Sequence, residues 1–98
     1  MNLAVFVSDY KRLPDNFDRL KADKLGIILV QDGVNYAAVK ENGKVADILS
    51  KGTECYALTE DLQTRGFTDA DVDGKVKIID YSALVDLIFN DYEKLAWI

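Results

Sequence analysis

The chain has 98 residues, the size of one ordinary domain, and it is 49% hydrophobic and 30% charged. These proportions are typical of a soluble globular protein, so we expect one domain over residues 1–98. The net charge of −5 disfavours direct binding to nucleic acid or to an anionic membrane. The longest apolar run, Leu25 to Val30, is too short to span a bilayer, and no signal peptide is recognisable. We therefore expect a cytoplasmic protein.

The inventory of reactive side chains narrows the chemistry further. The sequence contains no histidine, which excludes Ser-His-Asp and Cys-His catalysis and histidine metal sites. Cys55 is the only cysteine, so an internal disulfide, a CxxC redox pair and an all-cysteine zinc site are excluded as well. We expect no cofactor.

The first half of the chain alternates apolar and helical patterns. Leu3 to Val7 is an apolar run typical of a buried strand, and Pro14 suits the first turn of a helix after it. Leu25 to Val30 predicts a second strand that is covered on both faces. The break at Gln31-Asp32-Gly33 ends that strand, and Val34 to Lys40 is predicted to be helical.

The second half repeats this alternation. Glu54 to Leu58 predicts a third strand, and Thr59 is expected to cap a helix that ends at Arg65-Gly66. A fourth strand is predicted at Val76 to Ile79, followed by a helix capped by Ser82.

The tail from Leu95 to Ile98 is too apolar to stay in solvent, so we expect it to dock on the domain. The whole order predicts βαβ units. The expected fold is a small Rossmann-like or flavodoxin-like α/β three-layer sandwich with a mainly parallel sheet of about four to five strands.

A binding site in such a fold is expected at the carboxyl ends of the strands. No GxGxxG or GxxxxGK[ST] motif follows any strand, and the edge is acidic, so nucleotide binding is disfavoured. The alternative is that these residues cap helices and keep the rim solvated. The candidate interface or crevice residues are Gln31, Asp32, Gly33, Tyr56, Glu60, Asp61, Arg65, Asp80, Tyr81 and Trp97.

An acidic loop offers a second, weaker hypothesis. Asp69, Asp71 and Asp73 precede Gly74 in the pattern that opens a calcium loop, and Asp80 stands at its twelfth position. A strand rather than a helix is predicted after this loop, and two lysines inside it oppose a cation. A solvated acidic turn is therefore the preferred interpretation, and we expect no metal.

Cys55 is the only candidate nucleophile or sulfur carrier. It lies inside a predicted strand, several residues before the next helix, and Glu54 beside it disfavours the thiolate. A small apolar role in the sheet is the preferred interpretation, and persulfide carriage is the alternative.

Three runs together carry a family resemblance: IILVQDGV from Ile27, YALTEDLQTRGF from Tyr56 and VKIIDYSALVDLI from Val76, with a terminal LAWI. In this order they resemble the DsrH/TusB family, part of the DsrE/DsrF/DsrH-like superfamily, over nearly the whole chain. The resemblance implies a small α/β sandwich.

The resemblance also implies a subunit of a sulfur-relay complex that assembles with two paralogous subunits. In one branch the complex passes persulfide sulfur toward 2-thiolation of the tRNA wobble uridine, and in the other it serves sulfur oxidation. The principal acceptor cysteine of the family lies on a paralogous subunit, just beyond the strand equivalent to Glu54–Leu58. We therefore expect a non-catalytic interaction subunit. The alternatives are a persulfide carrier through Cys55 and a stand-alone, homo-oligomeric member of the family whose function is unknown.

Overall fold

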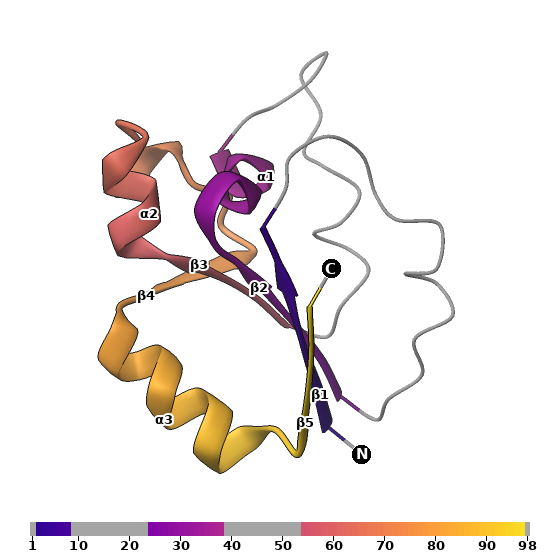
Figure 1. Ribbon diagram of the computed structural model, residues 1–98. Helices are drawn as coiled ribbons and strands as arrows, with labels where there is room; N and C mark the ends of the chain where they lie inside the picture. Colours follow the sequence, from indigo (N-terminus) through magenta and orange to yellow (C-terminus); the bar gives the residue numbers. More distant parts are fainter. Residues whose placement is uncertain (1, 9–23, 39–53, 98) are drawn as a thin grey trace.

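A parallel five-stranded sheet forms the centre of the molecule, as Figure 1 shows for a computed structural model that describes residues 2–8, 24–38 and 54–97. All four strand pairings are parallel, in the order β4-β3-β2-β1-β5. The helix predicted after Pro14 lies outside the described residues. The strands are β1 (Asn2–Val7), β2 (Lys24–Leu29), β3 (Glu54–Leu58), β4 (Val76–Ile79) and β5 (Lys94–Trp97).

Helices cover both faces of this sheet, which confirms the predicted three-layer α/β fold. The 3-10 helix η2 (Gln31–Val34) continues into α1 (Asn35–Ala38), and α2 (Thr59–Thr64) follows β3. A second 3-10 turn, η4 (Asp69–Asp71), precedes β4. The longest helix, α3 (Tyr81–Asp91), connects β4 to β5 and packs on the opposite face.

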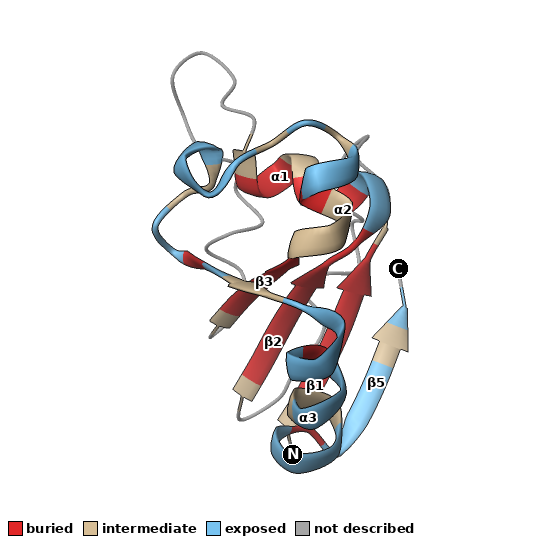
Figure 2. Cartoon of the chain, turned by 90° about the vertical axis from the view of Figure 1, so that its left-hand side faces the viewer, coloured by how far each residue is buried: buried red, intermediate tan, exposed pale blue. Residues whose placement is uncertain are grey.

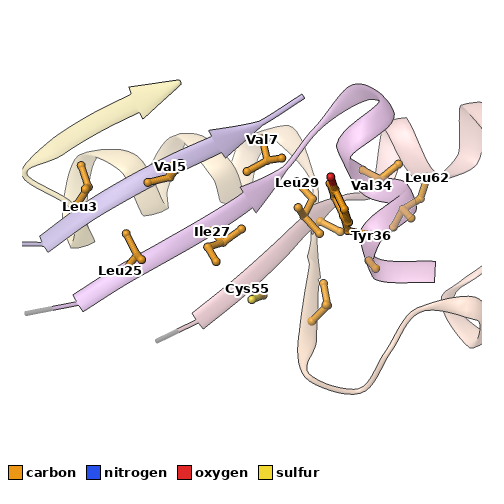
Figure 3. Close-up of a cluster of buried hydrophobic side chains, with 13 residues drawn as sticks. Leu3, Val5, Val7, Leu25, Ile27, Leu29, Val34, Tyr36, Cys55 and Leu62 are labelled. Atoms are coloured by element: carbon orange, nitrogen blue, oxygen red, sulfur yellow. The ribbon is translucent and has the colours of Figure 1, made fainter. Parts of the chain in front are cut away.

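The face under α1 and α2 holds the larger core cluster. Every second residue of the three inner strands points into it, because side chains alternate across a strand. Ile27 of β2 is fully buried at its centre, and Val34 and Leu62 close it from η2 and α2. Figure 3 shows the Cys55 side chain on this face, with Ile27 on the neighbouring strand.

The face under α3 holds a second cluster. Phe6, Ile28 and Tyr56 reach it from the three inner strands, and Leu84 and Tyr92 cover them from α3 and the residue after it. Each of these five residues is at most 8% exposed. Burial on both faces explains why β1 and β2 read as continuous apolar runs in the sequence.

The apolar tail docks as predicted, in the form of an edge strand. β5 pairs in parallel with β1, and the tail's Trp97 is in register with Phe6. The two rings stack with their centroids 5.0 Å apart and their planes 14° from parallel. Figure 2 nevertheless shows much of β5 exposed, in contrast to the buried inner strands.

Two helix caps differ from the prediction. Thr59 is the first residue of α2, and Leu58 occupies the cap position without a side-chain hydrogen bond. Asp80, rather than Ser82, caps α3, with its Oδ1 accepting a bond from the backbone N–H of Ala83 at 2.8 Å. The cap falls where the strand stops, and β4 stops at Ile79, so Asp80 is the residue in position.

Candidate functional site

The point where the strand order reverses lies between β1 and β5, and this is where α/β folds open a crevice. Ser8, just past the end of β1, and Trp97, at the end of β5, occupy that place. The Trp97 indole Nε1–H donates a hydrogen bond to Ser8 Oγ at 3.2 Å while its ring stacks on Phe6. The chain's own indole therefore covers the switch point.

The carboxyl ends of β2 and β3 bring together four of the predicted site residues. The backbone N–H of Gln31 donates to Asp61 Oδ2 at 2.7 Å. The Arg65 guanidinium donates to Asp32 Oδ1 through Nε at 3.1 Å and Nη2 at 2.8 Å, and through Nη1 to the Asp61 carbonyl at 3.2 Å. These bonds connect η2, at the end of β2, to α2, at the end of β3. The hydrogen bonds run in both directions, since η2 donates to Asp61 and Arg65 donates to Asp32. The cluster lies at the carboxyl edge of the sheet, where the site was expected.

Gln31 and Gly33 hold the backbone of η2 close to the sheet. Gln31 has φ of 50°, a left-handed conformation that is unfavourable for a side chain with a Cβ. Gly33 lies against β1, where an added Cβ would collide with the Val7 carbonyl oxygen. The bond from Gln31 to Asp61 holds the strained residue, and the missing side chain at Gly33 lets η2 reach β1.

The other predicted site residues do not join this cluster. Tyr56 lies in the core on the α3 face, and Asp80 caps α3. Tyr81 is 55% exposed at the start of α3. Glu60 is half-buried on α2, and its Oε1 accepts no hydrogen bond from the described part of the chain.

Sequence reasoning missed a polar cluster at the amino ends of the strands. The Glu54 carboxylate lies 3.6 Å from Nζ of both Lys24 and Lys77, and it accepts a hydrogen bond from the Tyr56 hydroxyl. The Tyr56 bond and the two lysines lower the pKa of Glu54, although burial opposes them. Burial, followed by the Glu54 bond, raises the pKa of Tyr56. Only the strand register, in which Tyr56 pairs with Lys77, reveals this network.

Cys55 lies inside β3 and is 3% exposed. Burial raises the pKa of its thiol to about 11, and the charge of Asp73 adds to this effect. A thiol nucleophile needs the thiolate form and access to its target, and here both are suppressed.

The acidic loop uses its carboxylates locally. Asp71 Oδ2 accepts from the Thr68 backbone N–H at 2.8 Å, and Asp73 Oδ1 accepts from the Lys75 N–H at 2.9 Å. Asp80 is engaged as the α3 cap. In the described stretches, no three His, Cys, Asp or Glu side chains gather in a way that would hold a metal ion. Likewise, no described helix is long and apolar enough to cross a membrane.

These features define a small, all-parallel α/β protein whose single thiol is buried and whose strand-end residues bind one another. The chain belongs to the DsrH-like family: the family model described as DsrH like protein matches residues 8–94. It is 38% identical to Protein TusB of Photorhabdus laumondii over 72% of this chain and 73% of that protein. It is 34% identical to Protein TusB of Escherichia coli K12 over 81% of each chain.

Two solved structures share the fold. Protein Tm0979 from Thermotoga maritima matches with a TM-score of 0.57 and 27% identity, over 90% of this chain and 93% of that one. MTH1491 from Methanobacterium thermoautotrophicum, titled a protein of unknown function, matches with a TM-score of 0.65 over 98% and 99% of the two chains. At 14% identity, the second likeness concerns the fold alone.

Proposed function

We propose that this chain is a non-catalytic interaction subunit of a sulfur relay that leads to 2-thiolation of the tRNA wobble uridine. Membership of the DsrH-like family and the likeness to Protein TusB support the relay. The observation that carries the non-catalytic role is the burial of Cys55, the only thiol of the chain.

The place of the thiol in the strand also supports this role. In the family, the resemblance puts the principal acceptor cysteine on a paralogous subunit, just beyond the strand equivalent to β3. In this chain that place is the start of α2, with Thr59, Glu60 and Asp61. Carboxylates there would raise the pKa of a neighbouring thiol. This chain therefore serves the relay by binding the subunits that carry the sulfur.

A complementation experiment in the native host tests both parts of the proposal. Deleting the gene should lower the 2-thiouridine content of digested tRNA, measured by liquid chromatography and mass spectrometry. Complementation with the Cys55→Ala variant should restore thiolation to the wild-type level, because no sulfur is transferred through this residue.

Two results would contradict the proposal in different ways. Unchanged thiolation in the deletion strain would refute the tRNA relay. Failure of Cys55→Ala to restore thiolation, with the variant folded and present at wild-type abundance, would instead identify Cys55 as a persulfide carrier. A Cys55→Val variant, which keeps more of the side-chain volume, controls for the small cavity that alanine leaves.

A further inference from the structure

Five large apolar side chains are exposed along α3 and β5, and sequence reasoning anticipated only Tyr81 and Trp97. Their exposed fractions run from 49% for Val85 to 81% for Phe89. We call this set the α3–β5 patch; its members are Tyr81, Val85, Phe89, Leu95 and Trp97.

The three helical members form one stripe. Tyr81, Val85 and Phe89 are four residues apart, which places them along one side of α3. The other flank of the helix, with Ala83, Asp86, Asn90 and Asp91, lines a shallow hollow beside β4. The stripe therefore faces away from β4, toward the half of the sheet that contains β5.

The two strand members lie on the same face of the sheet as α3. Leu95 is in register with Ala4, and Trp97 with Phe6. Ala4 and Phe6 both belong to the cluster that packs under α3. Paired residues of neighbouring strands point to the same side, so Leu95 and Trp97 do so as well. Figure 2 shows α3 and β5 beside each other, both mostly in the pale blue of exposed residues.

The size of the patch matches that of a protein interface. An aromatic side chain exposes roughly 150–250 Å² when free, and Val and Leu expose less, so the five together expose on the order of 500 Å². A single patch of this size stands at the upper end for a monomer, and about 800 Å² per partner is usual for a stable complex. The five side chains alone therefore supply more than half of the area that one partner usually buries.

The rim of the patch is acidic and indicates the kind of partner. Four exposed carboxylates lie in the segment that begins with Asp80 and ends with Trp97, and Lys94 is its only cation. Two of the four, Asp86 and Asp91, stand on the flank of α3 that lines the hollow, next to the stripe. No cation of the described residues forms an ion pair with Asp86, Asp91 or Glu93. Asp91 also stands at the C-terminus of α3, where the helix dipole already favours positive charge. A second copy of this chain would bring the same negative rim against this one.

We propose that the α3–β5 patch binds a different protein subunit, whose docking surface is apolar at its centre and carries lysine or arginine at its rim. This inference rests on the proposed function and assigns the partner to this face of the molecule. Phe89 is the expected anchor, because it is the most exposed large apolar residue and stands beside Asp86 on the helix.

The test uses the chain co-expressed and purified with the paralogous relay subunits of the same organism. Phe89→Ser should weaken their association by about tenfold or more, since truncating an aromatic anchor removes much of the binding energy. Asp86→Lys should weaken it several-fold at low salt and by less at high salt. Asp69→Lys, on the η4 turn, is the matched control: it makes the same change in net charge and should leave the dissociation constant unchanged.

Each alternative result overturns a distinct claim. Equal binding of wild type and Phe89→Ser would refute the patch and leave the relay function standing. Tighter binding by Asp86→Lys would refute the claim that the partner carries lysine or arginine at the rim of its docking surface. A dimer of the purified chain alone that Phe89→Ser dissociates, measured by sedimentation, would identify a second copy as the occupant. Absence of any binding by the folded wild type would refute both the patch and the proposed function.

Discussion

Gly33→Ala tests how η2 is fastened to the sheet. The added Cβ would overlap the Val7 carbonyl oxygen, and this obstacle is backbone that cannot rotate away. To relieve the overlap, η2 must move from β1 and lengthen the 3.1 Å hydrogen bond from Val30 N–H to the same oxygen. Overpacking of this kind costs about 1–3 kcal/mol and the weakened bond about 1 kcal/mol. We expect a loss of about 2–4 kcal/mol in the free energy of unfolding.

Urea unfolding followed by circular dichroism measures this loss, and the slope of the transition should stay constant. Gly74→Ala is the matched control, because a Cβ at Gly74 meets nothing within 4 Å. That variant should lie within about 0.5 kcal/mol of wild type. A Gly33→Ala protein as stable as Gly74→Ala would refute the close approach of η2 to β1 and return Gly33 to the candidate interface.

Three further predictions concern stability. Asp80→Ala should cost about 1 kcal/mol in urea unfolding, whereas Ser82→Ala should cost less than about 0.5 kcal/mol, because only Asp80 caps α3. Gly26→Ala should lower stability by about 1–3 kcal/mol, since its Cβ would overlap the buried Tyr92 ring; an unchanged melting temperature would contradict this packing. Burial raises the pKa of Cys55 to about 11, so above pH ~8.5 the unfolded chain releases this proton first. The unfolding free energy of wild type should then fall by up to about 1.4 kcal/mol per pH unit relative to that of Cys55→Val, up to pH 11. Parallel plots of unfolding free energy against pH for the two proteins would refute this prediction.

The strands were predictable because their signal is local. After one polar residue at the start of each strand, the runs at β1, β2 and β3 are apolar, and burial on both faces requires that pattern whatever the strand order. The tail was also predictable as a docked segment from its apolar composition, although it docks by strand pairing and by the stack of Trp97 on Phe6, while Leu95 and Trp97 stay largely exposed. Its pairing with β1 was not, because residues at opposite ends of the chain meet there.

The candidate site was predictable as a place but not as a set of bonds. Asp32 and Arg65 are 33 positions apart, and their contact depends on β2 and β3 being neighbours. Gly33 was predicted to lie at this edge of the sheet. Its role, to let η2 pass close to the Val7 carbonyl oxygen, follows from a contact that no sequence pattern encodes. Whether Asp80 or Ser82 caps α3 depends on the residue at which β4 ends, and the sequence alone did not define that residue.

The geometry of β3 supports the proposal that the thiol chemistry does not take place on this chain. Cys55 is the second residue of the strand, and α2 begins at Thr59, after the strand's other end. At about 3.3 Å per residue, the thiol lies roughly 13 Å from the edge where parallel sheets present their sites. No change of side-chain rotamer spans that distance, and the neighbours of Cys55 on the sheet are core residues. At the switch point itself, Trp97 covers the end of β1. If the chain acts as the proposed interaction subunit, it offers a partner its outer surface, and the largest apolar part of that surface in the described residues is the α3–β5 patch.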